Sequence, residues 1–184
     1  MPLPLSTVIT TERLRLRAIS YEDIPFVFEA SQFPGFCDGM RWDPPASPNE
    51  LKSVTAKNIE SWISGTQYTF TIDSIDAGAP VGRIALRTLQ KGVWYVGFWV
   101  DPAHWGKGIA TEAARALVAF AFAEMGAAAV LSSHATWNEA SQRVIEKLGM
   151  QLLGENPHGF EKNGQPVPEL EYVLLRPGGS ASHL

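Results

Sequence analysis

Residues 100–113, VDPAHWGKGIATEA, join the end of an apolar segment to the start of a helix-forming one. Within them, Gly106 and Gly108 flank Lys107, and the helical run begins at Ile109. Glycine lets the backbone approach a ligand closely and adopt positive φ, and the first N–H groups of a helix point outward with a partial positive charge. The stretch is typical of a loop that holds a pyrophosphate, although a glycine pair between strand and helix also serves as a simple tight turn.

Two common nucleotide-binding motifs do not account for this stretch. A P-loop places Lys-Ser or Lys-Thr after its last glycine, and the dinucleotide fingerprint has three spaced glycines early in a repeating strand-helix unit. Here Gly108 precedes Ile109 and Ala110, so neither motif fits.

The segment WGKGIA, residues 105–110, resembles the pyrophosphate loop Gln/Arg-x-x-Gly-x-Gly/Ala of the GNAT superfamily of acetyl-CoA-dependent N-acetyltransferases. It is most similar to the RimJ/RimL-type branch, which modifies protein N-termini and in which Trp commonly takes the Gln/Arg position. The likeness continues, in the family's order and spacing, with TERLRLR at residues 11–17, GFWVDP before the loop, TEA after it, and NEASQRVIEKLGM at residues 138–150.

Hydrophobic periodicity and turn signals outline the elements along the chain. Leu14, Leu16 and Ala18 alternate with arginines, which is the period of a half-buried strand. Further strands are expected over about residues 68–73, 81–89, 93–100, 129–136, 150–160 and 169–175. Helices are expected over about residues 21–30, 48–64, 109–125 and 138–148, the second starting from a capping box, Ser47-Pro48-Asn49-Glu50, with proline at the first helical position.

The resemblance implies an α+β GNAT fold: a mostly antiparallel mixed sheet of about seven strands, with flanking helices and a splay between the fourth and fifth strands. Residues 1–176 are expected to form a single acetyltransferase domain. The last residues, 177–184, are expected to be a disordered tail.

The composition of the chain excludes some kinds of partner and site but does not identify the protein. The 184 residues, 45% of them apolar, suit one domain, and a formal charge of −4 without a basic cluster argues against nucleic acid as a partner. The single cysteine, Cys37, excludes an internal disulfide, and no His/Cys spacing resembles a metal site. No signal peptide or membrane span is evident, so a cytoplasmic protein is expected.

In the family, the pantetheine arm of acetyl-CoA lies in the splay and the pyrophosphate meets the amides of the following loop. The resemblance therefore places the arm beside Phe98, Trp99 and Val100, and it assigns the phosphates to Gly106, Lys107, Gly108, Ala110 and Thr111. For Lys107 the backbone N–H is expected to bind, because a side chain in such a loop often points to solvent.

Asn138, Ser141 and Arg143 stand at the start of the last helix. The residues alone indicate a capped helix, since Asn is a good N-cap and Ser141 sits at N3. The resemblance adds that the Asn contacts the coenzyme arm and that a hydroxyl nearby protonates the departing thiolate, a role that falls to Ser141. Both interpretations can hold together, because one side chain accepts and donates at once.

The general base is not marked by a motif. His134 on the fifth predicted strand and Glu161, with Glu155 and His158 as neighbours, are the candidates, because RimL-like members carry a catalytic carboxylate in the segment after the last helix. A hydrogen-bonded strand histidine and a solvated hairpin carboxylate are the ordinary alternatives. Metal ions have no role in this interpretation.

Residues 34–45, PGFCDGMRWDPP, form the loop in which the family builds its acceptor wall. Arg41, Trp42 and Asp43 are the candidate acceptor-binding residues, with packing over the core as the alternative. Cys37 in the same loop has no adjacent base and is interpreted as an inert thiol.

The expected reaction is direct attack of a neutral amine on the acetyl thioester in a ternary complex. A lysine ammonium has a pKa of about 10.4 and an α-amino group about 7.8, so an α-amine needs less help from a base near neutral pH. A protein or peptide N-terminus is therefore the leading acceptor; a small-molecule amine and a non-catalytic acyl-CoA-binding module are the alternatives. Departures from the family pattern at Phe98 and at residues 169–172, ELEY, leave the acceptor open, and a homodimer is possible.

Overall fold

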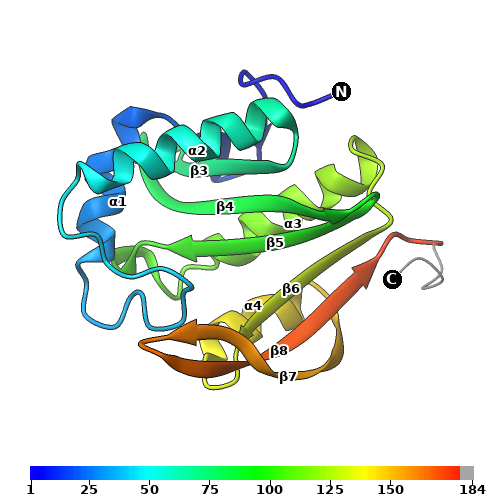
Figure 1. Ribbon diagram of the computed structural model, residues 1–184. Helices are drawn as coiled ribbons and strands as arrows, with labels where there is room; N and C mark the ends of the chain where they lie inside the picture. Colours follow the sequence, from blue (N-terminus) through cyan, green and yellow to red (C-terminus); the bar gives the residue numbers. More distant parts are fainter. Residues whose placement is uncertain (179–184) are drawn as a thin grey trace.

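Eight strands form one mixed sheet in the computed structural model, which describes residues 1–178 (Figure 1). They are β1 (Val8–Thr10), β2 (Leu14–Ala18), β3 (Gln67–Ser74), β4 (Ala79–Gln90), β5 (Val93–Val100), β6 (Ala129–Ala135), β7 (Gln151–Lys162) and β8 (Gln165–Leu175). Their order in the sheet is β1-β2-β3-β4-β5-β6-β8-β7, and β5 and β6 form the parallel pair in an otherwise antiparallel arrangement.

Strand β1 was not expected from the sequence. Its three residues are too few for an alternating pattern to be recognised, and it forms by pairing with β2, where Ile9 lies opposite Leu16. The other strands lie where the periodicity places them, with β7 and β8 extended toward the hairpin that joins them. The expected tail falls at residues 177–184, of which 179–184 lie outside the described residues.

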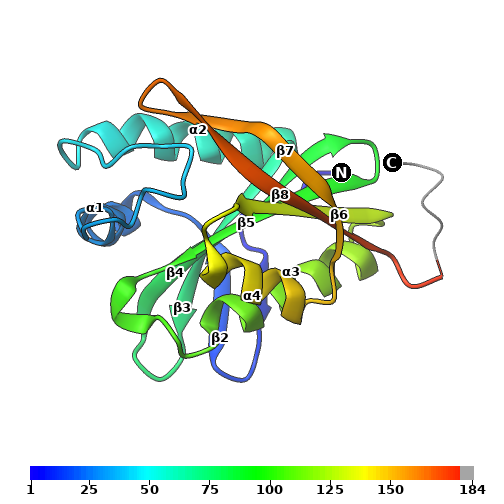
Figure 2. The same ribbon diagram turned by 90° about the horizontal axis from the view of Figure 1, so that it is seen from below.

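Helices cover both faces of the sheet (Figure 2). The helices are α1 (Ile24–Ser31), α2 (Glu50–Ser64), α3 (Ile109–Ala123) and α4 (Glu139–Lys147), with 3-10 turns η1 (Tyr21–Asp23) and η2 (Pro102–His104). Helices α1 and α2 lie on one side of the sheet, and α3 and α4 lie on the other. No helix among residues 1–178 has the length and apolar character needed to cross a membrane.

Two helix starts differ from expectation. The first predicted helix opens as the 3-10 turn η1, and the α-helix itself begins at Ile24. Pro25 suits the first turn of α1, because an N–H at that position would have no intrahelical acceptor. Helix α2 begins at Glu50 rather than Pro48. The Glu50 carboxylate accepts from the Ala46 N–H at 3.1 Å, whereas the predicted capping box would have it accept from the N–H of the next residue, Ser47. Gly65, in the left-handed conformation at φ 77°, ends α2 as predicted.

The main core lies between the sheet and α3. Inward-facing residues of β2, β3 and β4, such as Leu16, Phe70 and Leu86, are fully buried against the alanine-rich face of α3, where Ala113 and Leu117 are also fully buried. Small residues on α3 let the helix approach the sheet closely. This packing fixes the start of α3, and with it the loop that precedes it.

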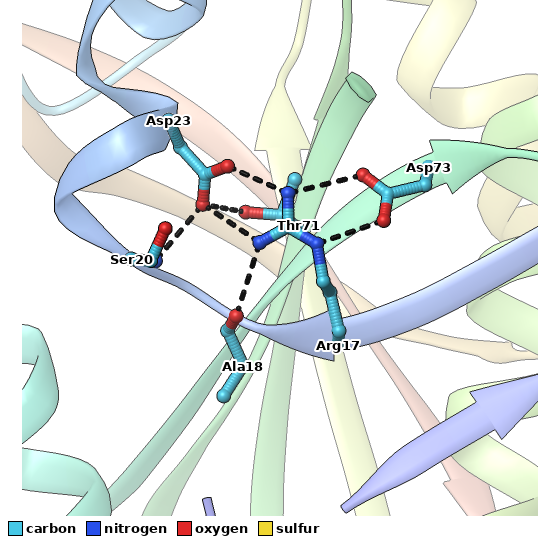
Figure 3. Close-up of polar contacts among 6 residues, drawn as sticks. All are labelled: Arg17, Ala18, Ser20, Asp23, Thr71 and Asp73. Carbon is cyan, nitrogen blue, oxygen red and sulfur yellow. Dashed lines mark hydrogen bonds and ion pairs between the residues drawn. The ribbon is translucent and has the colours of Figure 1, made fainter. Parts of the chain in front are cut away.

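The opposite face of the sheet carries a charged network (Figure 3). The Arg17 guanidinium pairs with Asp23 at 2.7 Å and with Asp73 at 2.8 Å, while Ser20 N–H and Thr71 Oγ1 also donate to Asp23. Burial alone would raise the pKa of Asp23, but hydrogen bonds from Arg17 and Thr71 outweigh it and hold that pKa below its usual value. The network ties η1, and so the start of α1, to β2 and β3.

Strands β5 and β6 separate along their length. They pair only from Val93 to Tyr95 on β5 and from Ala129 to Leu131 on β6, and no β5–β6 pair follows in the described residues. The expected splay between the fourth and fifth strands is therefore the gap between β5 and β6 here, since β1 adds one to the count. The gap opens toward the loop that follows Val100.

Candidate active site

Two cavities meet at the splay. The loop cavity, about 540 Å³, is lined by the loop after β5 and the first turns of α3 and α4. The sheet cavity, about 780 Å³, lies against the face of β3–β6 that α1 and α2 cover. Residues that line both cavities are Gly39, Met40, Phe98, Trp99, Asn138 and Ser141. A ligand in one cavity can therefore reach a ligand in the other at this boundary.

The loop before α3 has the backbone shape of an anion site. Gly106 and Gly108 have φ of +76° and +78°, and apart from the chain neighbours of Gly106 no atom of residues 1–178 lies within 4 Å of where a Cβ on Gly106 would stand. The Glu112 amide bonds back to the Gly108 carbonyl at 3.0 Å, so the amides of Ile109, Ala110 and Thr111 before it lack intrahelical acceptors. Left-handed glycines beside a helix N-terminus form a concave set of N–H donors that suits a pyrophosphate.

Arg13 at the start of β2 holds this loop in place. Its guanidinium donates to the Lys107 carbonyl at 3.1 Å and pairs with Glu112 on α3, which also accepts from Thr11 Oγ1 at 2.6 Å. The Lys107 side chain turns back to the Ala103 carbonyl at 3.0 Å and does not line the loop cavity. The TERL segment thus supports the loop from a distant part of the chain.

The free edge of β5 offers backbone groups to the splay. The Val96 and Val100 carbonyls accept from Ser132 Oγ and Trp105 Nε1, at 2.9 and 2.7 Å, on the side away from β4. Because backbone groups alternate along a strand, the Phe98 groups and the Val100 N–H also point away from β4. Phe98, Trp99 and Val100, which the sequence predicts to lie beside the coenzyme arm, all line the loop cavity.

The start of α4 closes the loop cavity. Asn138 is the N-cap, and its Oδ1 accepts from the Ser141 N–H at 3.1 Å, which agrees with the capped-helix interpretation. Its Nδ2 and the Ser141 hydroxyl are not used by the cap, and both residues line the two cavities. Arg143 pairs with Glu139 at 3.3 Å on the exposed surface and lines the loop cavity, where its charge suits a phosphate.

Glu169 on β8 is the buried carboxylate of the sheet cavity. Only 5% of the residue is exposed, its Oε1 accepts from Ser133 Oγ at 2.8 Å, and its Oε2 accepts from Arg41 at 2.6 Å. A carboxylate offers about four lone-pair sites, so Glu169 keeps acceptor capacity for a further donor. Ser133 is bonded in turn to the Tyr95 hydroxyl at 2.8 Å, and burial raises the pKa of that phenol.

The loop of residues 34–45 forms one wall of the sheet cavity, as expected. Lys162 on β7 fastens it, donating to the carbonyls of Cys37, Met40 and Trp42 and pairing with Asp43 at 2.7 Å. The Asp43 carboxylate is thereby paired with Lys162.

The predicted acceptor-binding residues all line this cavity: Arg41, Trp42 and Asp43. Cys37 is 3% exposed and lines neither cavity, and burial raises the pKa of its thiol, which disfavours a covalent role.

The candidate bases fall in different places. His134 lines the sheet cavity, but it is 3% exposed, and its ring nitrogens contact the Ala135 carbonyl at 2.8 Å and the Tyr172 hydroxyl at 3.2 Å. Glu155, His158 and Glu161 are exposed on β7, and among the described residues none of the three lines either cavity. The structure therefore places Ser141 at the boundary between the cavities and His134 in the sheet cavity, but leaves Glu161 outside both.

Sequence reasoning missed Glu169, Lys162 and Arg83 as parts of the site. Glu169 had been noted only as a departure from the family pattern, and the signal that would have found it is its spacing of three residues from Tyr172 on a strand beside the splay. Lys162 and Arg83 carry no local signal, because their partners and their burial come from elements distant in sequence.

Comparisons with known proteins agree with this geometry. A family model described as Acetyltransferase (GNAT) domain matches residues 13–151. The N-acetyltransferase YoaA of Bacillus subtilis is 30% identical over 178 residues, covering 92% of this chain and 97% of YoaA. FsC-acetyl coenzyme A-N(2)-transacetylase of Aspergillus fumigatus is 39% identical, covering 96% of this chain and 77% of that protein.

Solved structures share the fold. RimL, the ribosomal L7/L12 α-N-protein acetyltransferase in complex with coenzyme A, superimposes with a TM-score of 0.84 at 19% identity, covering 92% of this chain and 98% of RimL. A GNAT-family acetyltransferase from Bacillus anthracis gives 0.83 at 23% identity, covering 93% and 99%. The α+β fold expected from the sequence is confirmed, and the chain belongs to the GNAT acetyltransferase family, as an acetyl-CoA-dependent N-acetyltransferase.

Proposed function

We propose that this enzyme acetylates a primary α-amine, with a peptide or protein N-terminus as the leading acceptor, by direct transfer in a ternary complex. The observation that carries the proposal is the meeting of the loop cavity and the sheet cavity at Phe98, Trp99, Asn138 and Ser141. The loop cavity suits the coenzyme, and the sheet cavity suits the acceptor. Acetyl-CoA would supply an activated acetyl thioester at the boundary between them.

Three groups around this boundary would carry the steps of the reaction. Glu169 would orient the incoming amine and accept its proton, since it is the buried carboxylate with spare acceptor sites. The Val100 N–H, on the free edge of β5, would donate to the developing oxyanion. Ser141 would donate a proton to the departing thiolate, because its hydroxyl is not used by the helix cap.

The acceptor class rests on chemistry and on relatives. At neutral pH more than about a tenth of an α-amine with pKa of about 7.8 is already deprotonated, whereas a lysine ammonium is almost wholly protonated. An α-amine therefore needs less help from a base than a lysine side chain does. RimL, which shares the fold, is an α-N-protein acetyltransferase.

A small-molecule amine is the second candidate. It is favoured by the 39% identity to FsC-acetyl coenzyme A-N(2)-transacetylase, whose name assigns acetyl transfer to an N(2) position. It is also favoured by Arg83, a buried cation whose Nε and Nη2 have no hydrogen-bond partner in the described residues. Its acceptor would be an amine compact enough for the sheet cavity.

The deciding experiment measures CoA release from acetyl-CoA across N-terminal peptides, lysine peptides, free amino acids and polyamines, with product masses. We expect acetylation of α-amines, led by peptide N-termini. Turnover confined to free amino acids or polyamines would favour the second candidate. Acetyl-CoA binding without amine-dependent release in any sample would instead favour a non-catalytic acyl-CoA-binding module.

A further inference from the structure

Arg83 lies in a row of side chains across the sheet, on the face covered by α1 and α2. The register pairs Arg17 with Thr71, Thr71 with Arg83, and Arg83 with Trp99. Arg83 and Trp99 both line the sheet cavity, and Trp99 also lines the loop cavity. Arg83 is therefore one strand away from the boundary where the two cavities meet.

Two nitrogens of the Arg83 guanidinium are buried without a partner in the described part of the chain. The residue is 7% exposed, and its Nε and Nη2 have no hydrogen-bond partner among residues 1–178. Burial lowers the pKa of Arg83 to about 10, so the group stays charged at neutral pH. Buried charges in proteins are nearly always paired, because an unpaired one is strongly destabilising.

Asp23 attracts the Arg83 charge but makes no hydrogen bond to it in the described residues. Asp23 accepts four other hydrogen bonds, two from Arg17 and one each from Ser20 N–H and Thr71 Oγ1. Asp73 is held by Nε and Nη2 of Arg17. The same edge of the guanidinium that binds a carboxylate in Arg17 is thus without an acceptor in Arg83.

The carboxylates that line the sheet cavity have partners other than Arg83. Glu169 pairs with Arg41, Asp43 pairs with Lys162, and Glu50 accepts from the Ala46 N–H. The coenzyme phosphates are no better placed, since Arg83 does not line the loop cavity. What remains is a ligand that enters the sheet cavity.

We propose that Arg83 binds a carboxylate of the acceptor, so that the preferred substrate is an α-amine carrying an anionic group close to the reacting nitrogen. The planar guanidinium edge matches a carboxylate with two parallel hydrogen bonds. The carboxylate comes either from a free amino acid or from an acidic first residue of a peptide. This inference rests on the proposed function and specifies its substrate class.

The test uses acceptors that differ only in charge. Serine is compared with serinamide, and Asp-Ala-Ala amide with Asn-Ala-Ala amide, with kcat/KM expressed per deprotonated amine. In one of the two pairs we expect the anionic acceptor to be preferred by about ten- to a hundredfold, the range for hydrogen bonds to a charged group. The pair that shows the preference identifies the source of the carboxylate.

Arg83→Gln should bring that ratio close to one, and Arg83→Lys should restore part of it. Arg15→Gln, an exposed arginine on β2 that lines neither cavity, serves as the control and should keep the wild-type ratio. A purely structural role for Arg83 would lower all rates together and leave the ratio unchanged. Equal rates within both pairs in the wild-type enzyme would overturn the inference while leaving the proposed function intact.

If no acceptor is turned over, the proposed function fails, and binding decides the inference separately. The N-acetylated forms of the same four compounds are titrated calorimetrically into the wild-type protein with CoA present. Tighter binding of an anionic product, lost in Arg83→Gln, supports the carboxylate site. Equal binding of charged and neutral products, or no binding, overturns it.

Discussion

The loop cavity and the sheet cavity are built in different ways. Most of the loop cavity comes from residues 98–111 and 137–147, each running from the end of a strand into a helix. The sheet cavity takes residues from α1, α2, the 34–45 loop and strands β3, β4, β5, β6 and β8. The first presents backbone donors at glycines and helix ends, and the second presents side chains whose positions depend on long-range packing.

This difference predicts how each cavity responds to substitution. Backbone donors cannot be removed by changing a side chain, so the loop cavity is disturbed mainly by adding bulk or charge. The sheet cavity can be changed by deleting one carboxylate or one guanidinium. Effects on coenzyme affinity and effects on the acceptor should therefore separate cleanly.

Gly108→Glu should give the largest effect. It places an anion where the phosphates would lie and forces a non-glycine residue to φ of +78°, so acetyl-CoA affinity should fall by roughly a hundredfold or more. Calorimetric titration with acetyl-CoA measures it, with circular dichroism to confirm folding.

Gly149→Glu provides the matched control for this change. Gly149 has φ of +76° at the end of α4 and does not line either cavity. Apart from its chain neighbours, no atom of the described residues lies within 4 Å of where its Cβ would stand. It should show the same backbone strain with normal coenzyme binding. Normal acetyl-CoA affinity in a folded Gly108→Glu protein would contradict the loop assignment.

Glu169→Gln should act on the other cavity. Glutamine can still accept from Arg41 but cannot take up a proton at neutral pH, so kcat should fall about ten- to a hundredfold while acetyl-CoA binding is unchanged. Steady-state kinetics, with an amine that the wild-type enzyme acetylates as the acceptor, measures the change in kcat. Glu161→Gln is the comparison variant and should keep the wild-type kcat. A lower kcat in Glu161→Gln with an unchanged kcat in Glu169→Gln would identify Glu161, the residue that the sequence suggested, as the base instead.

The same contrast explains what the sequence could predict. The glycines at 106 and 108 and the N-cap at Asn138 act through local backbone geometry, so a short motif was enough to place them. Glu169, by contrast, accepts from Arg41, 128 residues away, and from Ser133 on another strand, so its surroundings depend on contacts distant in sequence. In the sequence, Arg83 is an ordinary polar position of an alternating strand. Only the packing of α1 and α2 over that face of the sheet makes it a buried residue.

Ser141→Ala tests the boundary between the cavities and should have a smaller effect. Without its hydroxyl the departing thiolate must be protonated by water, so kcat should fall about tenfold, whereas the affinity for acetyl-CoA should stay within twofold. Stopped-flow CoA release measures the step. The helix cap should survive, because it uses the Ser141 backbone N–H, and unchanged turnover would remove Ser141 as the acid.

Asn138 has a structural role and a proposed coenzyme-binding role, and two substitutions separate them. Asn138→Ala removes the acceptor for the Ser141 N–H and should lower the free energy of unfolding by about 1 kcal/mol, while Asn138→Asp keeps a capping oxygen and should retain that stability. Chemical denaturation measures both. If the amide Nδ2 donates to the coenzyme arm, acetyl-CoA affinity should fall in both variants, because aspartate has no such donor. If acetyl-CoA affinity instead falls in Asn138→Ala but not in Asn138→Asp, Asn138 contributes to the loop cavity only by starting α4. Its contribution would then be one of backbone geometry, like that of the glycines.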